Sequence, residues 1–158
     1  MILFLLIFPL IVWGQNSTTQ STSLNQFGAL ELAKQANIEA LKLGKNVSIA
    51  VLDASGTVIL LLKGDNVGPH NTEASKRKAF TALSTKTASL ELMKKADASS
   101  SSKNLNTIAE LLLLGGGVPV WKDGELIGSI GISGGGSGEN DHFIAVTAIQ
   151  NLNFKINY

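Results

Sequence analysis

The sequence predicts an α+β domain in which helices cover an antiparallel β-sheet of four or five strands. In residues 115–136, two β-type apolar runs lie between glycine clusters, and the Asp123-Gly124 pair that joins the runs is a strong hairpin signal. A second pair of β-type runs surrounds a turn cluster at residues 53–56. Stretches with helical spacing precede, separate and follow the two hairpins, which is typical of α+β domains.

The first helix is predicted to follow a capping box at residues 23–26. In this box, Ser23 accepts a hydrogen bond from an early backbone amide and Gln26 reaches back. The helix is expected to end at Gly44. Its apolar positions are mostly alanine, so we expect close packing against the sheet. These positions are Ala29, Leu32, Ala33, Ala36, Ala40 and Leu43.

Residues 47–52 and 57–62 are predicted to form the first hairpin. The second run is apolar at every position from Val58 to Leu62, and we therefore expect a strand that is covered on both sides. Residues 111–114 are also apolar, and they fit either a strand or the end of a helix because periodicity does not separate the two.

Further helices are predicted over residues 72–84, 87–95 and 137–151. The serine-rich residues 98–103 are expected to be a flexible connection that is too short to separate two domains. We therefore expect a single domain.

The first residues of the chain predict export. Residues 1–14 resemble a signal peptide, because residues 1–12 are almost wholly apolar yet shorter than the roughly 20 residues that a membrane-spanning helix needs. The polar residues 15–23 are then expected to be a disordered mature N-terminus. The resulting prediction is a periplasmic or secreted protein with no membrane span after the signal is removed.

The composition excludes several classes of site. The chain has no cysteine, which excludes disulfides, covalently attached haem, a thiolate nucleophile and cysteine-based metal clusters. The formal net charge is only +1 and aromatic residues make up 6%. We therefore expect no nucleic-acid partner, since neither a strong positive field nor a stacking platform is present in the sequence.

Several motifs, taken in order, resemble the GlcG/HbpS family of haem-binding or haem-degrading proteins. They cover nearly all of residues 24–152 and lie at residues 51–56, 78–82, 116–120 and 124–134, with Asp141 after them. The resemblance implies a single profilin-like domain over residues 24–158, a three-layer α/β/α arrangement with a central five-stranded antiparallel sheet. It also implies assembly into homo-oligomers and, in some members, haem or a related tetrapyrrole as ligand. Relatives often carry Arg-x-Asp-Gly-Ala after the second strand, where this chain has Lys-Gly-Asp-Asn-Val at residues 63–67.

The two histidines are candidate ligands for haem iron or another metal, because neutral imidazole is a common ligand of both. His70 lies in a Gly-Pro loop before a helix, where a solvent-exposed histidine with no ligand is the alternative. His142 follows Asp141 in the first turn of the last helix, and the two residues are candidates for a small metal or acid–base cluster. Acidic residues there also suit a helix N-terminus on electrostatic grounds alone.

Basic residues on the second long helix are candidates for binding an anion. Lys78 belongs to the family-like run, and a lysine at a pocket rim pairs with a haem propionate or a substrate carboxylate. Arg77 and Glu73 are weaker candidates, since a solvated pair at this spacing contributes only about 0.2–0.5 kcal/mol. Lys76 is weaker for the same reason.

The two glycine clusters are candidates for holding an anion through exposed backbone amides. The residues concerned are Gly116, Gly117, Gly134 and Gly135. The second cluster leads into a helix N-terminus, which favours negative charge. The alternative is that these glycines serve strand ends and a helix entry that need flexible backbone.

Three functions remain open at this point. The first is an exported haem- or tetrapyrrole-binding protein, with haem degradation as a further activity, in which His70 or an oxygen ligand holds iron. The second is an enzyme or sensor for a small carboxylate that uses no haem. The third is a structural module whose apolar surface serves subunit contacts.

Overall fold

A computed structural model describes residues 17, 19 and 21–157; the predicted signal peptide at residues 1–14 lies outside the described residues. Its centre is a four-stranded antiparallel sheet with strand order β2-β1-β4-β3. The strands are β1 (Ser48–Asp53), β2 (Val58–Leu62), β3 (Gly117–Lys122) and β4 (Glu125–Ser133). Five α-helices and one 3₁₀ turn complete the described part: α1 (Gln26–Lys42), α2 (His70–Thr85), α3 (Ser89–Ala98), α4 (Ser100–Lys103), the 3₁₀ turn η1 (Asn104–Thr107) and α5 (Gly138–Asn151).

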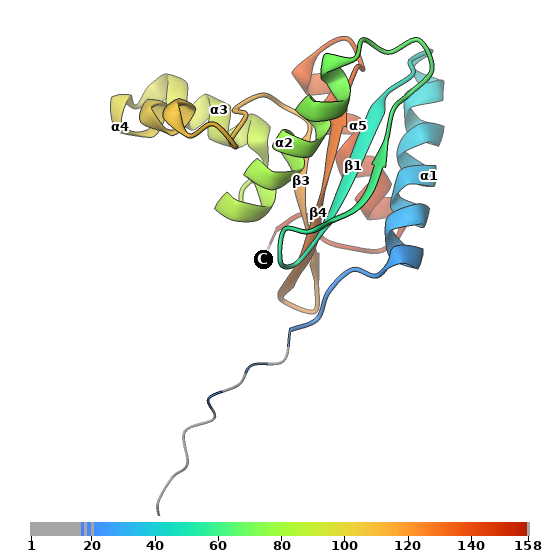
Figure 1. Cartoon of the computed structure of the whole chain (residues 1–158), viewed down its shortest axis with the longest axis horizontal. Coiled ribbons are helices and arrows are strands. Elements are labelled where there is room, and N and C mark those ends of the chain that lie inside the picture. The colour runs from blue at the N-terminus through green and yellow to red at the C-terminus, as the bar shows by residue number, and fades with distance from the viewer. Residues whose placement is uncertain (1–16, 18, 20, 158) are drawn as a thin grey trace, which may run out of the picture.

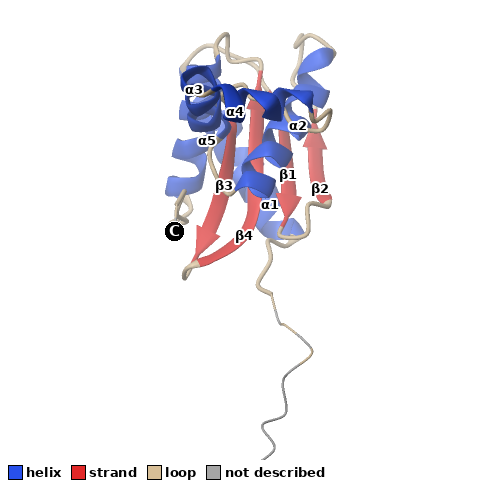
Figure 2. Ribbon diagram, turned by 90° about the vertical axis from the view of Figure 1, so that its left-hand side faces the viewer, coloured by secondary structure: helices blue, strands red, loops and turns tan. Residues whose placement is uncertain are grey.

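The sheet lies between two layers of helices, so the predicted α/β/α layering is present. Helix α2 covers one face, while α1 and α5 lie side by side on the other (Figures 1 and 2). Helices α3 and α4 extend away from the sheet as an arm (Figure 1). None of the helices in residues 21–157 is long and apolar enough to span a bilayer.

The main core fills the space between the sheet and the α1–α5 layer. Branched residues of the central strands, such as Ile49, Ile130 and Ile132, are fully buried there. Helix α1 meets them with Ala29, Leu32, Ala33, Ala36 and Ala40, and this confirms the predicted close packing of an alanine-rich helix.

The opposite face of the sheet is built from small residues, which allows helix α2 to lie directly on it. A methyl group added at Gly131 would overlap the carbonyl oxygen of Ser75, and one at Gly117 would overlap that of Lys78. Glycine is needed at these two strand positions because the backbone of α2 approaches so closely. This face therefore has no room for a guest between the glycines and the helix.

The second hairpin forms as predicted. Asp123 and Gly124 both have positive φ values, 50° and 81°, as a tight two-residue turn between twisted strands requires. The hairpin is β3–β4, and β4 also pairs with β1 to join the two hairpins into one sheet.

The prediction of a fifth strand is wrong. Residues 111–114 form neither strand nor helix, because side chains from neighbouring helices bind their backbone groups. The Thr81 hydroxyl accepts from the amide of Leu112 (2.8 Å), and the Ser89 hydroxyl donates to the carbonyl of Leu114 (2.7 Å). In the described part of the chain, only a single bridge between Trp121 and Lys155 extends the sheet beyond β3.

The expectation that residues 57–62 form a doubly covered strand is also wrong. Strand β2 is at the edge of the sheet, and Val58, Leu61 and Leu62 are exposed. An unbroken apolar run occurs both in strands buried on two sides and in exposed hydrophobic edge strands, so the run alone does not distinguish them.

The predicted cap of the first helix is wrong by two residues. Asn25 is the cap and its side chain accepts from the amide of Gly28 (2.9 Å). Ser23 instead accepts a hydrogen bond from the amide of Ala54 in the first hairpin turn (3.0 Å). The predicted flexible connection at residues 98–103 contains the short helix α4.

Candidate functional site

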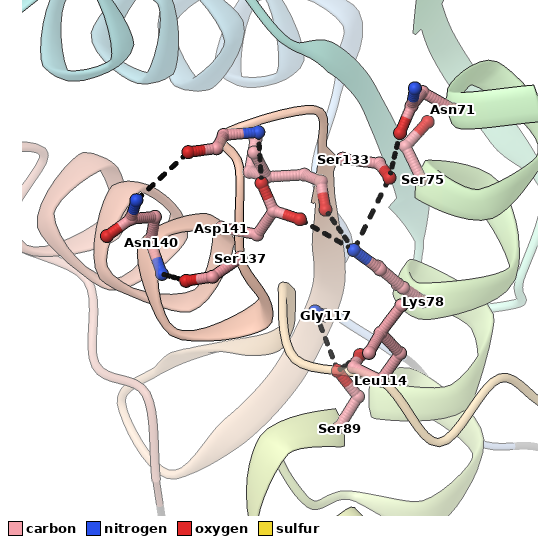
Figure 3. A network of polar contacts seen from close by, with 12 residues as sticks. Asn71, Ser75, Lys78, Ser89, Leu114, Gly117, Ser133, Ser137, Asn140 and Asp141 are labelled. Atoms are coloured by element: carbon pink, nitrogen blue, oxygen red, sulfur yellow. Dashed lines mark hydrogen bonds and ion pairs between the residues drawn. The ribbon is translucent and has the colours of Figure 1, made fainter. Parts of the chain in front are cut away.

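A buried ion pair joins helix α2 to the opposite helical layer past the end of strand β4. The side chain of Lys78 is 1% exposed, and its Nζ lies 2.8 Å from Asp141 Oδ2 at the start of α5 (Figure 3). The same Nζ donates to the carbonyl of Ile132 (3.1 Å) and lies 3.4 Å from the hydroxyl of Ser133. All three donor positions of the ammonium group therefore have partners, as a buried charge requires.

The other oxygen of Asp141 holds the glycine-rich loop before α5. Its Oδ1 accepts from the backbone amide of Gly135 (2.7 Å). Asn140 then donates to the carbonyl of Gly135 (2.9 Å), and the hydroxyl of Ser137 accepts from the amide of Asn140 (3.1 Å) (Figure 3). The loop is thus held by side chains of the helix that it precedes.

These contacts correct the predicted position of Lys78 at a pocket rim. A lysine and a glycine amide do meet a carboxylate, as the sequence suggested, but the carboxylate is Asp141 of the same chain. Gly116 is enclosed as well, because an added methyl group would lie 2.8 Å from Asp141 Cβ. Gly134 has a φ of +116° and turns the chain out of β4.

Four side chains of α2 line a surface hollow of about 350 Å³ together with residues of the first hairpin and of the segment after η1. We call it the Phe80 hollow. Its apolar part comes from Leu52, Val58 and Phe80, and its charged groups come from both acidic and basic residues. The full lining is Leu52, Gly56, Val58, Glu73, Lys76, Arg77, Phe80, Ala109 and Glu110.

Arg77 is the notable polar group of the Phe80 hollow. One guanidinium nitrogen, Nη2, donates to the carbonyl of Leu111 (2.6 Å). Its Nε is buried and has no hydrogen-bond partner among the described residues. An unsatisfied buried donor costs about 1–3 kcal/mol, so an anionic or accepting ligand that reached Nε would gain a strong contact.

The predicted site residues are thus divided between two places. Glu73 and Arg77 line the Phe80 hollow, whereas Lys78, Asp141 and the glycines belong to the buried network. His70 begins α2 and is exposed, on the same helix as the hollow but not in its lining.

The predicted metal cluster around Asp141 and His142 is not formed. Within residues 21–157, the carboxylate of Asp141 is bound to Lys78, and no group of three or more histidine, aspartate or glutamate side chains could hold a metal ion. His142 is half-buried, and its Nδ1 has no partner in this range. Burial lowers the pKa of His142 below 6.5; Glu91 of helix α3 opposes this shift and Lys94 of the same helix adds to it.

Phe80 is the aromatic lining residue of the hollow that the sequence patterns did not single out. It lies inside the family-like run of residues 78–82, two positions after the candidate Lys78. Glu73, Arg77 and Phe80 recur at helical spacing, which places them on one side of α2. That spacing was the available signal for a mixed charged and aromatic surface.

Removal of the buried lysine is predicted to destabilise the fold strongly. Lys78→Met leaves the Asp141 carboxylate buried without its cation, and we expect a loss of about 3–5 kcal/mol in the free energy of unfolding. Lys76→Met is the matched control, because Lys76 forms an exposed 3.6 Å pair with Glu73 on the same helix and surface pairs contribute about 0–1 kcal/mol. Urea denaturation measures both, and equal stability of the two variants would contradict the role given to Lys78.

We predict that the folded state becomes less stable as the pH decreases, because His142 is protonated more readily in the unfolded chain. Its pKa is lower in the folded chain than the unfolded value of 6.5, so below about pH 6.5 the unfolded state binds more protons and is favoured. In His142→Gln this contribution is lost, and the decrease in melting temperature from about pH 7.5 to 5.5 should be smaller than in the parent. His70→Gln leaves His142 as the only imidazole, so its NMR titration gives the pKa directly; a midpoint above 6.5 would contradict the burial effect.

Comparison with known proteins places the chain in a family. The family described as haem degrading protein HbpS-like matches residues 24–150. The corrinoid adenosyltransferase PduO of Citrobacter freundii is 33% identical over 127 residues, which make up 79% of this chain and 38% of PduO. The chain therefore spans well under half the length of that curated relative.

Two solved structures are similar over nearly their whole length. A double mutant of Streptomyces reticuli HbpS is 35% identical with a TM-score of 0.80, covering 92% of this chain and 97% of the other. A complex of PduOC with haem is 32% identical with a TM-score of 0.78, covering 87% and 100%. Through the match over residues 24–150, this chain belongs to the HbpS-like family.

Proposed function

We propose that this protein binds haem or a related tetrapyrrole in the Phe80 hollow. The single observation that carries the proposal is the Nε atom of Arg77, a buried donor without a partner beside an apolar surface. A porphyrin has an apolar ring and two carboxylate side chains. The ring would lie against Leu52, Val58 and Phe80, and a propionate would accept from Arg77.

The family supports haem as the ligand. The PduOC structure, which is similar over its whole length, is a complex with haem, and the family description names haem degradation. The PduO relative acts on a corrinoid by its name, and a corrinoid is also a tetrapyrrole macrocycle. A site that binds large flat macrocycles with carboxylate or amide side chains would fit both haem and a corrinoid.

Two side chains of α2 are candidates for the iron ligand. Glu73 lies in the Phe80 hollow itself, and His70 stands one turn before it on the helix. When bound, haem iron supplies the oxidative chemistry that degradation of the ring requires. The chain contributes by orienting the propionates through Arg77 and by keeping water from the apolar side of the ring.

The proposed location is outside the cytoplasm, in the periplasm or secreted, and it rests on the signal-like residues 1–14. A small carboxylate is the second candidate ligand, because the guanidinium of Arg77 donates hydrogen bonds to carboxylates in general. It would use the polar side of the hollow and leave Phe80 and Val58 without a role, so haem uses more of the site.

Haem titration of the full chain tests the proposal by absorbance. We expect a saturable shift of the Soret band, with affinity reduced about tenfold in Arg77→Ala because a charge-assisted hydrogen bond is lost. Phe80→Ser is expected to weaken binding as well. Lys34→Ala on α1, which lies outside the hollow, is the control and should bind as the parent does.

The iron ligand is identified in the same titration. His70→Ala and Glu73→Gln are compared, and the variant with an altered spectrum marks the ligand. A chain that gives no Soret shift at all would overturn haem binding; stabilisation by simple organic acids alone, lost in Arg77→Ala, would point to the second candidate.

A further inference from the structure

Arg77 is the single arginine among the 13 basic residues of the chain, and its guanidinium group binds a segment that is distant in the sequence. Its Nη2 donates to the carbonyl of Leu111 (2.6 Å), which lies 34 positions further along the chain. A guanidinium group is planar, and its donors have fixed directions relative to one another. The contact with Leu111 therefore restricts the orientation of the other donors, including the buried Nε.

The amide next to the Leu111 carbonyl is held by Thr81, a fully buried residue of α2. The hydroxyl of Thr81 accepts from the amide of Leu112 (2.8 Å) and donates to the carbonyl of Arg77 (2.8 Å). A threonine hydroxyl has one proton, which the Arg77 carbonyl takes, so its lone pairs remain for the Leu112 amide. Both roles of this hydroxyl are therefore used.

The Leu111 carbonyl and the Leu112 amide belong to one peptide group. The described residues contain no cis peptide bond, and the N–H and C=O of a planar trans peptide group point in opposite directions. Because Thr81 fixes the N–H, it also fixes the direction of the carbonyl. Thr81 and Arg77, one turn apart on α2, thus bind opposite ends of the same peptide group.

This arrangement accounts for an ion pair that does not form. Glu73 precedes Arg77 by four residues, the spacing at which such side chains pair on an isolated helix, and Glu110 lines the same hollow. In the part of the chain that the structure describes, Arg77 pairs with neither of them, and Glu73 lies 3.6 Å from Lys76 instead. No carboxylate of the hollow therefore occupies the guanidinium group.

We propose that Thr81 is a positioning residue for the anion site of the Phe80 hollow. Through the peptide group of Leu111 and Leu112, it holds the guanidinium of Arg77 in the orientation that receives a carboxylate of the ligand. Thr81 does not line the hollow itself. A donor that is already oriented loses less conformational freedom on binding, which raises the affinity. The inference rests on the proposed function, since the ligand is the same.

The orientation of Arg77 is measurable in the full chain without any ligand. A single arginine gives a single Nε–H signal in NMR spectra, and this signal is expected to exchange slowly with water because Nε is buried. In Thr81→Val, which lacks the hydroxyl, we expect exchange on the order of tenfold faster. Thr81→Ser keeps the hydroxyl and is expected to retain slow exchange.

Thr85→Val is the matched control for the loss of a buried hydroxyl on α2. Thr85 donates to the carbonyl of Thr81 (2.7 Å), as Thr81 does to that of Arg77, but it does not bind Leu112. Its Nε–H signal should be that of the parent. Thermal melting shows whether Thr81→Val is folded. If it is not, amide exchange of Leu112 in the parent decides, because a Leu112 amide that exchanges as freely as an exposed loop overturns the proposal. Equal Nε–H exchange in the parent and a folded Thr81→Val overturns it too.

Haem titration of a double-mutant cycle tests the effect on binding. Thr81→Val is expected to weaken binding about threefold to tenfold in the parent and to have no effect in Arg77→Ala, because Thr81 acts through Arg77. An equal loss in both backgrounds, or unchanged affinity in Thr81→Val when Arg77→Ala binds more weakly, overturns the positioning role. A parent that binds no haem, or Arg77→Ala that binds as the parent does, contradicts the proposed function instead, and the exchange measurements then decide the role of Thr81.

Discussion

The buried pair of Lys78 and Asp141 is the interaction on which the rest of the structure depends. It connects α2, which covers one face of the sheet, to α5, which belongs to the other layer, and it does so beside the end of β4. A buried charge is tolerated only when it is paired and hydrogen-bonded. Here Ile132, Ser133 and Gly135 supply the remaining partners, so the network fixes the position of the glycine-rich loop as well as that of both helices.

This network explains why the glycines are not an open anion site. The sequence predicted that their backbone amides bind an anion, and the amide of Gly135 does bind a carboxylate. A lysine ammonium and a glycine amide do bind a carboxylate, but Asp141 provides it from within the chain. Gly117 and Gly131 have a second purpose, which is to let the backbone of α2 lie against the sheet. The proposed ligand site is therefore the Phe80 hollow, where α2 turns mixed charged and aromatic side chains outward.

Much of the fold was readable from local patterns. The Asp123-Gly124 turn, the alanine face of α1 and the order of helices and hairpins follow from periodicity and turn chemistry, which act over a few residues. The failures came from tertiary contacts. Residues 111–114 are apolar like a strand, yet Thr81 and Ser89 bind their backbone groups, and nothing in the local sequence signals that. The exposure of β2 likewise depends on its place at the sheet edge and not on its composition.

Local patterns also predicted only part of the candidate site, because the rest depends on tertiary contacts. Glu73 and Arg77 could be selected because they are charged and belong to one helix. Arg77 and Lys78 are neighbours in α2, and successive helical residues point about 100° apart. Arg77 therefore lines the hollow, whereas Lys78 points into the core toward Asp141. Residue type alone does not reveal that rotation, although the recurrence of Glu73, Arg77 and Phe80 at helical spacing does indicate a shared face.

A crystal structure of the full chain with haem bound tests the proposed site most directly. We expect the porphyrin in the Phe80 hollow, with a propionate on Arg77 and the Lys78–Asp141 pair unchanged. A porphyrin located against Gly116 and Gly135, with Lys78 released from Asp141 and turned toward a propionate, would contradict it.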